Sequence, residues 1–284
     1  MRNFILSAVV VSFLFACSNR VQQENIITVT IEPQRYFVEQ LVDTFFRIEC
    51  MVPVGTSPET YDPTPVQMAK LARSKAYFCI GHIGFEEVWI NKLKKNYPYI
   101  PFFDNSKGIA LITGHSHSGG RCNEDGIDPH TWSSPKAARV IVQNMYDALL
   151  EIDPENKNHY AANLQSLLEK INAVDEKVTQ ILNNSLQKAF IIYHPALTYF
   201  ARDYGLTQYS IETDGKEPSP EQLKSLIKTA KEVGVKTVFI QQEFDRKNAE
   251  IVAKETGCRL IIINPLSYDW GEEVINIAQA LSDE

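Results

Sequence analysis

Two histidines stand in short, proline-stiffened segments and are suited to binding a metal ion. His130 belongs to the segment DPHTW (128–132), and His194 opens the segment HPALTYF (194–200). Proline fixes its own φ angle and restricts the residue before it, so both imidazoles are carried by stiff backbone. The apolar run 189–193 directly before His194 predicts a buried strand, and open α/β sheets place their ligands at the carboxyl ends of such strands. We interpret the two histidines as metal ligands from two halves of one binding protein.

The elements that must position these ligands are eight short apolar, β-branched runs with helical patterns between them. The runs cover residues 26–31, 47–52, 76–80 and 99–103 in the first half, and 189–193, 208–212, 237–241 and 259–263 in the second half. Strands that alternate with helices are typical of parallel sheets. The sequence therefore predicts an α/β fold with two small lobes, each built on a four-stranded parallel sheet.

One long helical pattern lies between the two sets of strands. Apolar residues repeat at three- and four-residue intervals from Tyr160 to Leu182, which gives a single apolar stripe. Asp153 is the expected N-cap, with Pro154 in the first turn. A helix over residues 155–183 would be about 40 Å long at 1.5 Å per residue, and it would limit how far the lobes can hinge. The predicted domains are an N-terminal lobe (26–153), a linker helix (154–184) and a C-terminal lobe (185–284).

The first residues have the pattern of an export signal. Arg2 is followed by an apolar stretch from Phe4 to Ala16 and then by Cys17, and the apolar stretch is too short for a stable membrane span. We expect a signal peptide (1–17) with Cys17 as the lipidated residue and a polar tether over residues 18–25. Several acyl chains on that cysteine would anchor the protein firmly to the cell envelope. The alternative is an ordinary signal peptide with a chance cysteine.

Composition restricts the partners further. No later segment is long and apolar enough to span a bilayer, and the formal net charge of −7 argues against nucleic acid and fits a cationic ligand. Export implies an oxidising compartment. The cysteines that remain after the signal peptide can therefore pair in three ways; they are Cys50, Cys79, Cys122 and Cys258. Their spacings match no cysteine-based zinc motif.

Five motifs in order give the chain a specific resemblance. They are PVGTSPETYDPTP (53–65), DPHTWSSP (128–135), the run 194–206, EPSP (217–220) and the run 255–266. The chain resembles the zinc- and manganese-binding solute receptors of bacterial ABC importers, in the class whose lobes are joined by one rigid helix. This resemblance implies a monomeric binding protein without catalytic activity. Such a protein captures a divalent transition metal between its lobes and delivers it to an ABC permease.

The resemblance also implies a set of metal ligands. Members of the family usually carry histidine where this chain has Glu59, and Asp269 is the match for an acid after the last strand. With His130 and His194 these residues give two nitrogen and two carboxylate ligands, whose charge of −2 balances a divalent ion. Imidazoles favour zinc, whereas carboxylates favour manganese or iron; we expect zinc. His115 and His117 resemble a shortened form of the histidine-rich loop of zinc receptors, as an accessory metal site or as a solvated loop.

Two other functions remain open at this point. A zinc-dependent hydrolase on the same scaffold would keep an open coordination position for water, and a weakly bound Glu59 would leave one. The chain contains no HExxH helix, nucleophile elbow or phosphate-binding glycine loop. A surface adhesin would carry the same metal site.

Overall fold

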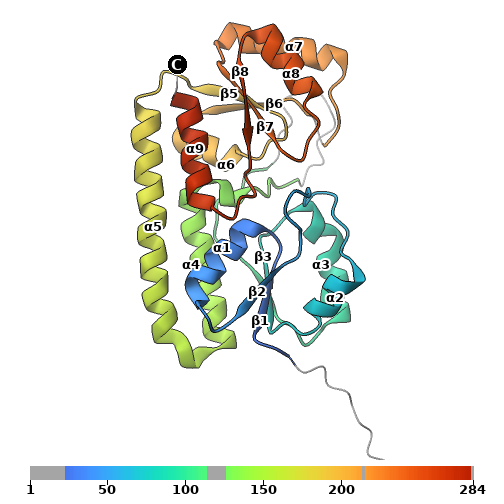
Figure 1. The fold of residues 1–284 in the computed structure, drawn as a ribbon, viewed down its shortest axis with the longest axis vertical. Coiled ribbons are helices and arrows are strands. Elements are labelled where there is room, and N and C mark those ends of the chain that lie inside the picture. Colours follow the sequence, from blue (N-terminus) through green and yellow to red (C-terminus); the bar gives the residue numbers. More distant parts are fainter. Residues whose placement is uncertain (1–22, 114–125, 213–214, 283–284) are drawn as a thin grey trace, which may run out of the picture.

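The structure is a computed structural model that describes residues 23–113, 126–212 and 215–282. Two lobes lie end to end beside one long helix, Lys157–Asn183 (Figure 1). Each lobe contains a four-stranded, all-parallel sheet, with the strand order β2-β1-β3-β4 in the first and β6-β5-β7-β8 in the second. The strands are β1 Ile26–Val29, β2 Arg47–Cys50, β3 Ala76–Cys79, β4 Phe102–Asp104, β5 Ala189–Ile192, β6 Thr207–Ser210, β7 Thr237–Gln241 and β8 Arg259–Ile263. The predicted fold class is confirmed.

Helices cover both faces of each sheet. They are α1 Glu32–Val42, α2 Pro65–Leu71, α3 Gly84–Asn96, α4 Pro135–Ile152, α5 Lys157–Asn183, α6 Thr198–Tyr204, α7 Pro220–Val233, α8 Lys247–Thr256 and α9 Trp270–Ser282. In the first lobe α1 and α4 pack on one face and α2 and α3 on the other; in the second lobe α6 and α9 lie opposite α7 and α8. Because both faces are covered, the central strands β1, β3, β5 and β7 are almost entirely buried.

Strand β4 begins three residues later than the run 99–103 predicts. Pro101 has no N–H to donate to a ladder, although its carbonyl accepts the N–H of Tyr77 at 2.9 Å. Regular pairing therefore starts at Phe102, which lies opposite Tyr77.

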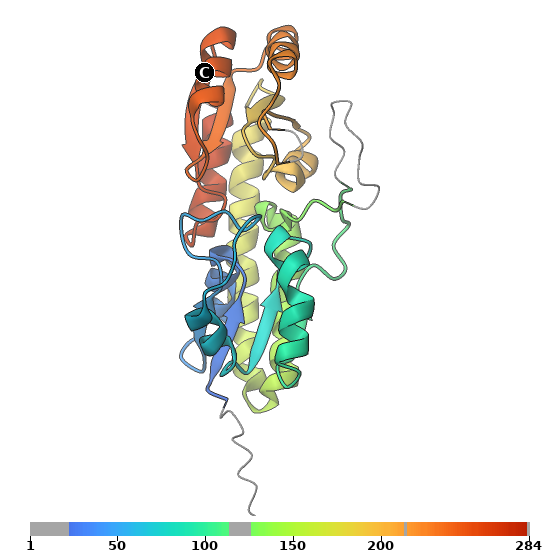
Figure 2. The ribbon, with the colours of Figure 1, turned by 90° about the vertical axis from the view of Figure 1, so that its right-hand side faces the viewer.

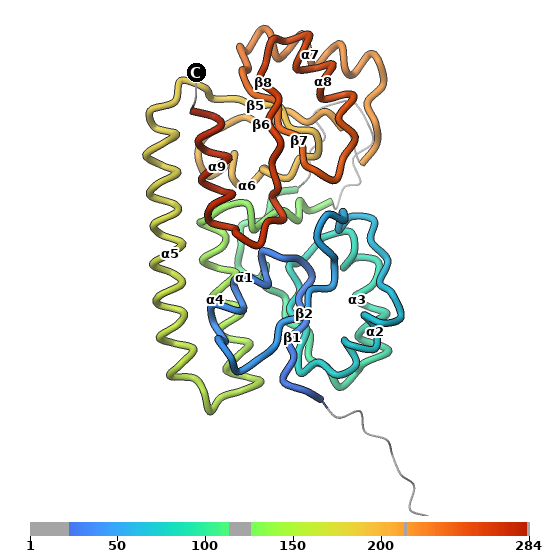
Figure 3. The backbone as a smooth tube through the Cα atoms, viewed as in Figure 1, coloured from blue at the N-terminus to red at the C-terminus, as the bar shows by residue number. Residues whose placement is uncertain are grey.

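Helix α5 has 27 residues and is about 40 Å long. It begins two residues later than predicted because Pro154–Asn156 form a 3₁₀ turn. The predicted cap Asp153 accepts hydrogen bonds from the side chains of Asn156 and Tyr160 instead of from a helix N–H. Figures 2 and 3 show α5 running alongside both lobes. One apolar core follows its buried stripe from the first lobe into the second, which ties the lobes to a common support.

The loop between β8 and α9 fastens the second lobe to the first. The indole N–H of Trp132 donates to the carbonyl of Pro265 at 2.9 Å, and that of Trp270 donates to the carbonyl of Trp132 at 2.7 Å. The hydroxyl of Tyr268 donates to Glu39 on α1 at 2.6 Å. These bonds cross between residues more than 130 positions apart, so the loop is held by tertiary contacts.

Three of the four cysteines considered for disulfides are free thiols within the described residues, namely Cys50, Cys79 and Cys258. Cys122 lies outside the described residues, as do the predicted signal peptide and its Cys17. In the ranges that the structure describes, no helix combines the length and apolar character needed to cross a membrane.

Candidate metal centre

The strands of both sheets run toward the gap between the lobes, so the loops at their carboxyl ends meet there (Figure 1). The loop after β2 carries Glu59, the segment after β4 carries His130, and His194 follows β5 closely. One ligand atom from each of these three residues lies within 4.8 Å of the other two. Three of the four predicted ligands, 71 and 64 positions apart in sequence, are therefore brought together.

His130 is a buried residue fixed by the aspartate two positions before it. Asp128 Oδ1 lies 2.9 Å from both the backbone nitrogen and the ring Nδ1 of His130, and the His130 ring packs against Trp132. Burial alone would lower the pKa of His130, but attraction and hydrogen bonding to Asp128, together with attraction to Glu59 and Glu212, outweigh it and the pKa is raised. Burial likewise opposes ionisation of Asp128, yet its pKa is lowered because His130 is beside it. The Asp128 carboxylate thus keeps a proton on Nδ1 and directs Nε2 toward the cluster.

His194 is held in the same way by the second lobe. Its Nδ1 lies 2.6 Å from Oε1 of Glu212, and the Gln241 side chain bonds to both the N–H and the carbonyl of His194. The Phe244 ring stacks on the imidazole with centroids 5.3 Å apart and planes 20° apart. The register that pairs Ile192 with Ser210 also brings His194 and Glu212, two positions further along, to the same sheet edge.

Glu59 is held from the first lobe by one glycine. The N–H of Gly84, the first residue of α3, donates to Oε2 of Glu59 at 3.1 Å. The other oxygen, Oε1, is buried and has no hydrogen-bond partner among the described residues. A buried carboxylate oxygen without a partner is costly, so this atom is suited to a cation.

The loop that presents Gly84 is itself fixed by a buried acid. Gly81 and His82 both have positive φ angles, 90° and 63°, and the latter is uncommon for a residue with a side chain. The Glu86 carboxylate accepts the N–H groups of Ile80 and Gly81, each at 2.8 Å. Burial raises the pKa of Glu86 to about 7. His82 is not among the clustered ligands.

The two imidazole Nε2 atoms lie 3.1 Å apart. Since each Nδ1 faces a carboxylate, Nε2 is the nitrogen of each ring that is left to bind a metal ion. A divalent ion placed between the two rings would accept both Nε2 atoms as ligands. Ligands at 2.0–2.1 Å in a tetrahedron lie about 3.3 Å apart, close to the observed separation. The two nitrogen donors therefore fit a zinc-sized ion, and a carboxylate oxygen of Glu59 lies within 4.8 Å of both.

Asp269, the fourth predicted ligand, lies outside this cluster. It is exposed, its backbone N–H donates to Ser267 Oγ at 3.2 Å, and its charge raises the pKa of Tyr36 on α1, although burial contributes more to that shift. The hydroxyl of the neighbouring Tyr268 donates to Glu39 on α1, and this bond holds this part of the loop against α1. His115 and His117 of the predicted accessory site lie outside the described residues.

Asp128, Glu212 and Gly84 were not predicted as site residues. Asp128 lies in the DPHTW motif, and its spacing of two from His130 could have marked it. Glu212 ends the predicted strand 208–212, so it could have been found as an acid at the ligand edge of the sheet. The contact between Gly84 and Glu59 spans 25 residues, and no local pattern indicates it.

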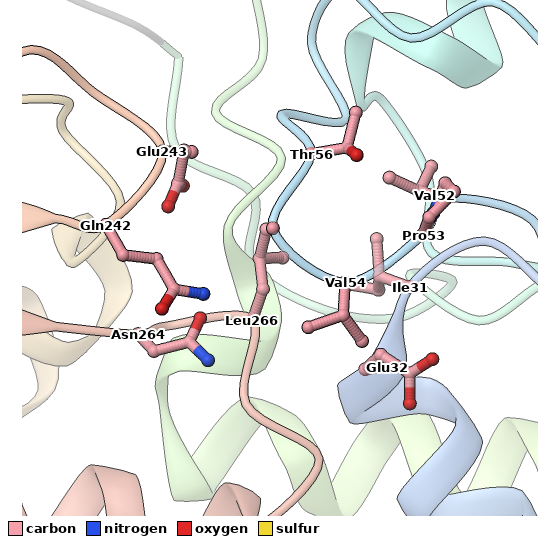
Figure 4. Close-up of a pocket in the computed structure, with 11 residues that line it drawn as sticks. Ile31, Glu32, Val52, Pro53, Val54, Thr56, Gln242, Glu243, Asn264 and Leu266 are labelled. Carbon is pink, nitrogen blue, oxygen red and sulfur yellow. The ribbon is translucent and has the colours of Figure 1, made fainter.

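A small hollow, open to solvent, lies between the lobes (Figure 4). The ligand trio does not line it. Its wall comes from both lobes and includes Glu32 and Thr56 on one side and Gln242, Glu243 and Asn264 on the other.

Comparison with known proteins agrees with this architecture. A family model described as "ZnuA: Zinc-uptake complex component A periplasmic" matches residues 27–279. The chain belongs to this family. The ZnuA family consists of solute-binding proteins for zinc uptake and not of enzymes, so the hydrolase alternative is set aside.

Individual relatives are similar over most of this chain. It is 28% identical to the zinc-binding lipoprotein AdcA of Streptococcus pneumoniae serotype 4 over 93% of this chain, but it spans only about half of AdcA, 55%. It is 28% identical to the high-affinity zinc uptake system protein ZnuA of Bacillus subtilis, over 84% of this chain and 78% of that protein. A crystal structure of a ZnuA deletion mutant with zinc bound superposes with a TM-score of 0.83 at 37% identity, covering 91% of this chain and 98% of that one.

Proposed function

We propose that this protein binds one divalent transition metal ion as cargo, zinc in preference to manganese or iron, through Glu59, His130 and His194. The observation that carries the proposal is the 3.1 Å approach of two carboxylate-backed Nε2 atoms beside the unpartnered Oε1 of Glu59. Hydrogen bonds to the far side of each imidazole fix its tautomer and raise its basicity, as partners of metal-bound histidines do.

The preference for zinc has two supports. Two imidazole nitrogens and one carboxylate oxygen form a donor set common in zinc sites, whereas manganese prefers more oxygen ligands. The similar AdcA and ZnuA proteins are named for zinc, and the ZnuA deletion mutant was crystallised with zinc bound.

We further propose that the metal-loaded protein delivers its ion to the permease of an ABC importer while lipid-anchored through Cys17 outside the inner membrane. Membership in a zinc-uptake family supports the delivery role. The lipoprotein name of the similar AdcA and the export pattern of residues 1–17 support the anchor.

Metal binding is tested by titrating the chain from Glu24 onward with zinc and manganese against a competing chelator. We expect one tightly held zinc ion, with binding abolished in His130→Ala and His194→Ala. His159→Ala is the matched control, because His159 lies on α5 beside Phe45 and Asn163, away from the cluster. Metal-free protein that takes up neither ion, or full zinc binding by His194→Ala, would contradict the proposal.

Delivery and anchoring need the full chain in its own cells. Radioactive zinc uptake should fall in a strain that carries His194→Ala in place of the wild type. The Cys17→Ser variant should leave the membrane fraction. Unchanged uptake in the first strain, or unchanged membrane association in the second, would refute the corresponding part of the proposal.

A further inference from the structure

The clustered trio leaves the coordination of the proposed ion incomplete. Zinc in closed sites is bound by four ligands, and the trio supplies three, with only one carboxylate against a charge of +2. Asp269 is exposed and is not among the clustered residues. A second acid near the two imidazoles would complete both the coordination number and the charge balance.

The loop between β7 and α8 brings such an acid to the same histidine. Gln241, the last residue of β7, bonds to both backbone polar groups of His194. Phe244 stacks on the His194 ring. Glu243 lies between these two contacts in sequence, so its backbone is held next to the cluster from both sides.

The Glu243 carboxylate has no strong competing partner. It is half-buried, lines the hollow between the lobes (Figure 4), and accepts no hydrogen bond from any other described residue. Burial raises the pKa of Glu243, while its own backbone N–H and the attraction of His194 and His130 oppose the rise. The carboxylate therefore lies within the electrostatic reach of both imidazoles and is free to change its contacts.

We propose that Glu243 is the fourth ligand, and that it turns from the hollow onto the ion when the metal binds. The inference rests on the proposed metal site. In the step, the carboxylate exchanges its own backbone N–H for the cation. Glu59 and Glu243 then supply the charge of −2 that balances a divalent ion.

The experiment compares Glu243→Gln with Glu32→Gln in the chain from Glu24 onward. Glu32 lines the same hollow from the first lobe, where it lies 3.7 Å from Arg35, so both variants remove one negative charge from one cavity. We expect Glu243→Gln to raise the zinc dissociation constant by about 10- to 100-fold and Glu32→Gln to leave it within about threefold. Cobalt-substituted protein should show an altered visible absorption spectrum only for Glu243→Gln, because only there does a ligand change.

The outcomes distinguish the metal site itself from the role of Glu243 within it. Wild-type protein that binds no zinc or cobalt would refute the proposed metal site itself. Wild-type protein that binds zinc, with Glu243→Gln equal to it in affinity and cobalt spectrum, would refute the role of Glu243 alone. Equal weakening in both glutamine variants without a spectral change would assign the effect to general charge in the hollow and would also overturn the inference.

Discussion

A methyl group at Gly84 should weaken metal binding through Glu59 without unfolding the protein. A Cβ at this position would lie 2.6 Å from the carbonyl oxygen of Glu59, 2.7 Å from its Oε2 and 3.0 Å from its Cα. Two of these atoms belong to the backbone, so the loop that carries Glu59 must move. Gly84 is not among the glycines with a positive φ, and alanine favours a helix by up to about 1 kcal/mol over glycine, so α3 itself should tolerate the change.

The size of the effect follows from the hydrogen bond that would be lost. A bond from Gly84 N–H to a charged carboxylate contributes about 1.5–3 kcal/mol. If that bond orients Oε1 toward the ion, its loss raises the dissociation constant for zinc by about 10- to 150-fold. The movement of this loop should change the free energy of unfolding of the metal-free protein by no more than about 1–3 kcal/mol.

Chelator-competition titration and urea unfolding of Gly84→Ala measure the two quantities separately. Gly271→Ala is the matched control, since Gly271 also lies in the first turn of a helix and its added Cβ would meet only a side-chain methyl of Val174, at 3.0 Å. The control should bind zinc as the wild type does. Zinc affinity of Gly84→Ala within threefold of the wild type would refute the positioning role of Gly84.

Three further predictions concern the supports of the site. Glu212→Gln should raise the zinc dissociation constant by about 10- to 100-fold with the stoichiometry unchanged, because His194 loses its carboxylate partner; titration with unchanged affinity would contradict this. Glu86 has a folded pKa of about 7 against an ordinary value of 4.5, so its protonated form contributes stability below pH 4.5 that is lost, by about 3 kcal/mol, as the pH rises to 7. The free energy of unfolding of metal-free Glu86→Gln, measured in urea, should not show this decline with pH. Parallel curves of unfolding free energy against pH for wild type and variant would contradict the prediction. Trp270→Phe removes the N–H that bonds to the Trp132 carbonyl and should lower the free energy of unfolding by about 1–3 kcal/mol; unchanged unfolding would show that this bond does not stabilise the fold.

The fold could be predicted because its signals are local. Buried parallel strands are continuous apolar runs, and all eight runs overlap strands, with ends displaced by one to three residues in six of them; the largest displacement is at Pro101. The stripe from Tyr160 to Leu182 indicated α5 in the same way. The order of strands within each sheet depends on contacts between distant residues, and the apolar pattern does not encode it.

The site could be predicted only in part, for a related reason. His130 and His194 carry local signals, a proline beside each and a strand before one, and the resemblance supplied Glu59. Asp269 was selected as an acid after the last strand, but Asn264 is the residue that directly follows β8. The direction of that loop is set by Tyr268 bonding to Glu39 across 229 residues, which no short motif reveals.

The most direct test of the central claim is anomalous diffraction from crystals of the zinc-loaded protein at the zinc absorption edge. We expect one strong peak between the lobes, about 2.0–2.2 Å from Nε2 of His130, Nε2 of His194 and Oε1 of Glu59. A peak elsewhere in the molecule, or no peak in crystals grown with excess zinc, would contradict the central claim.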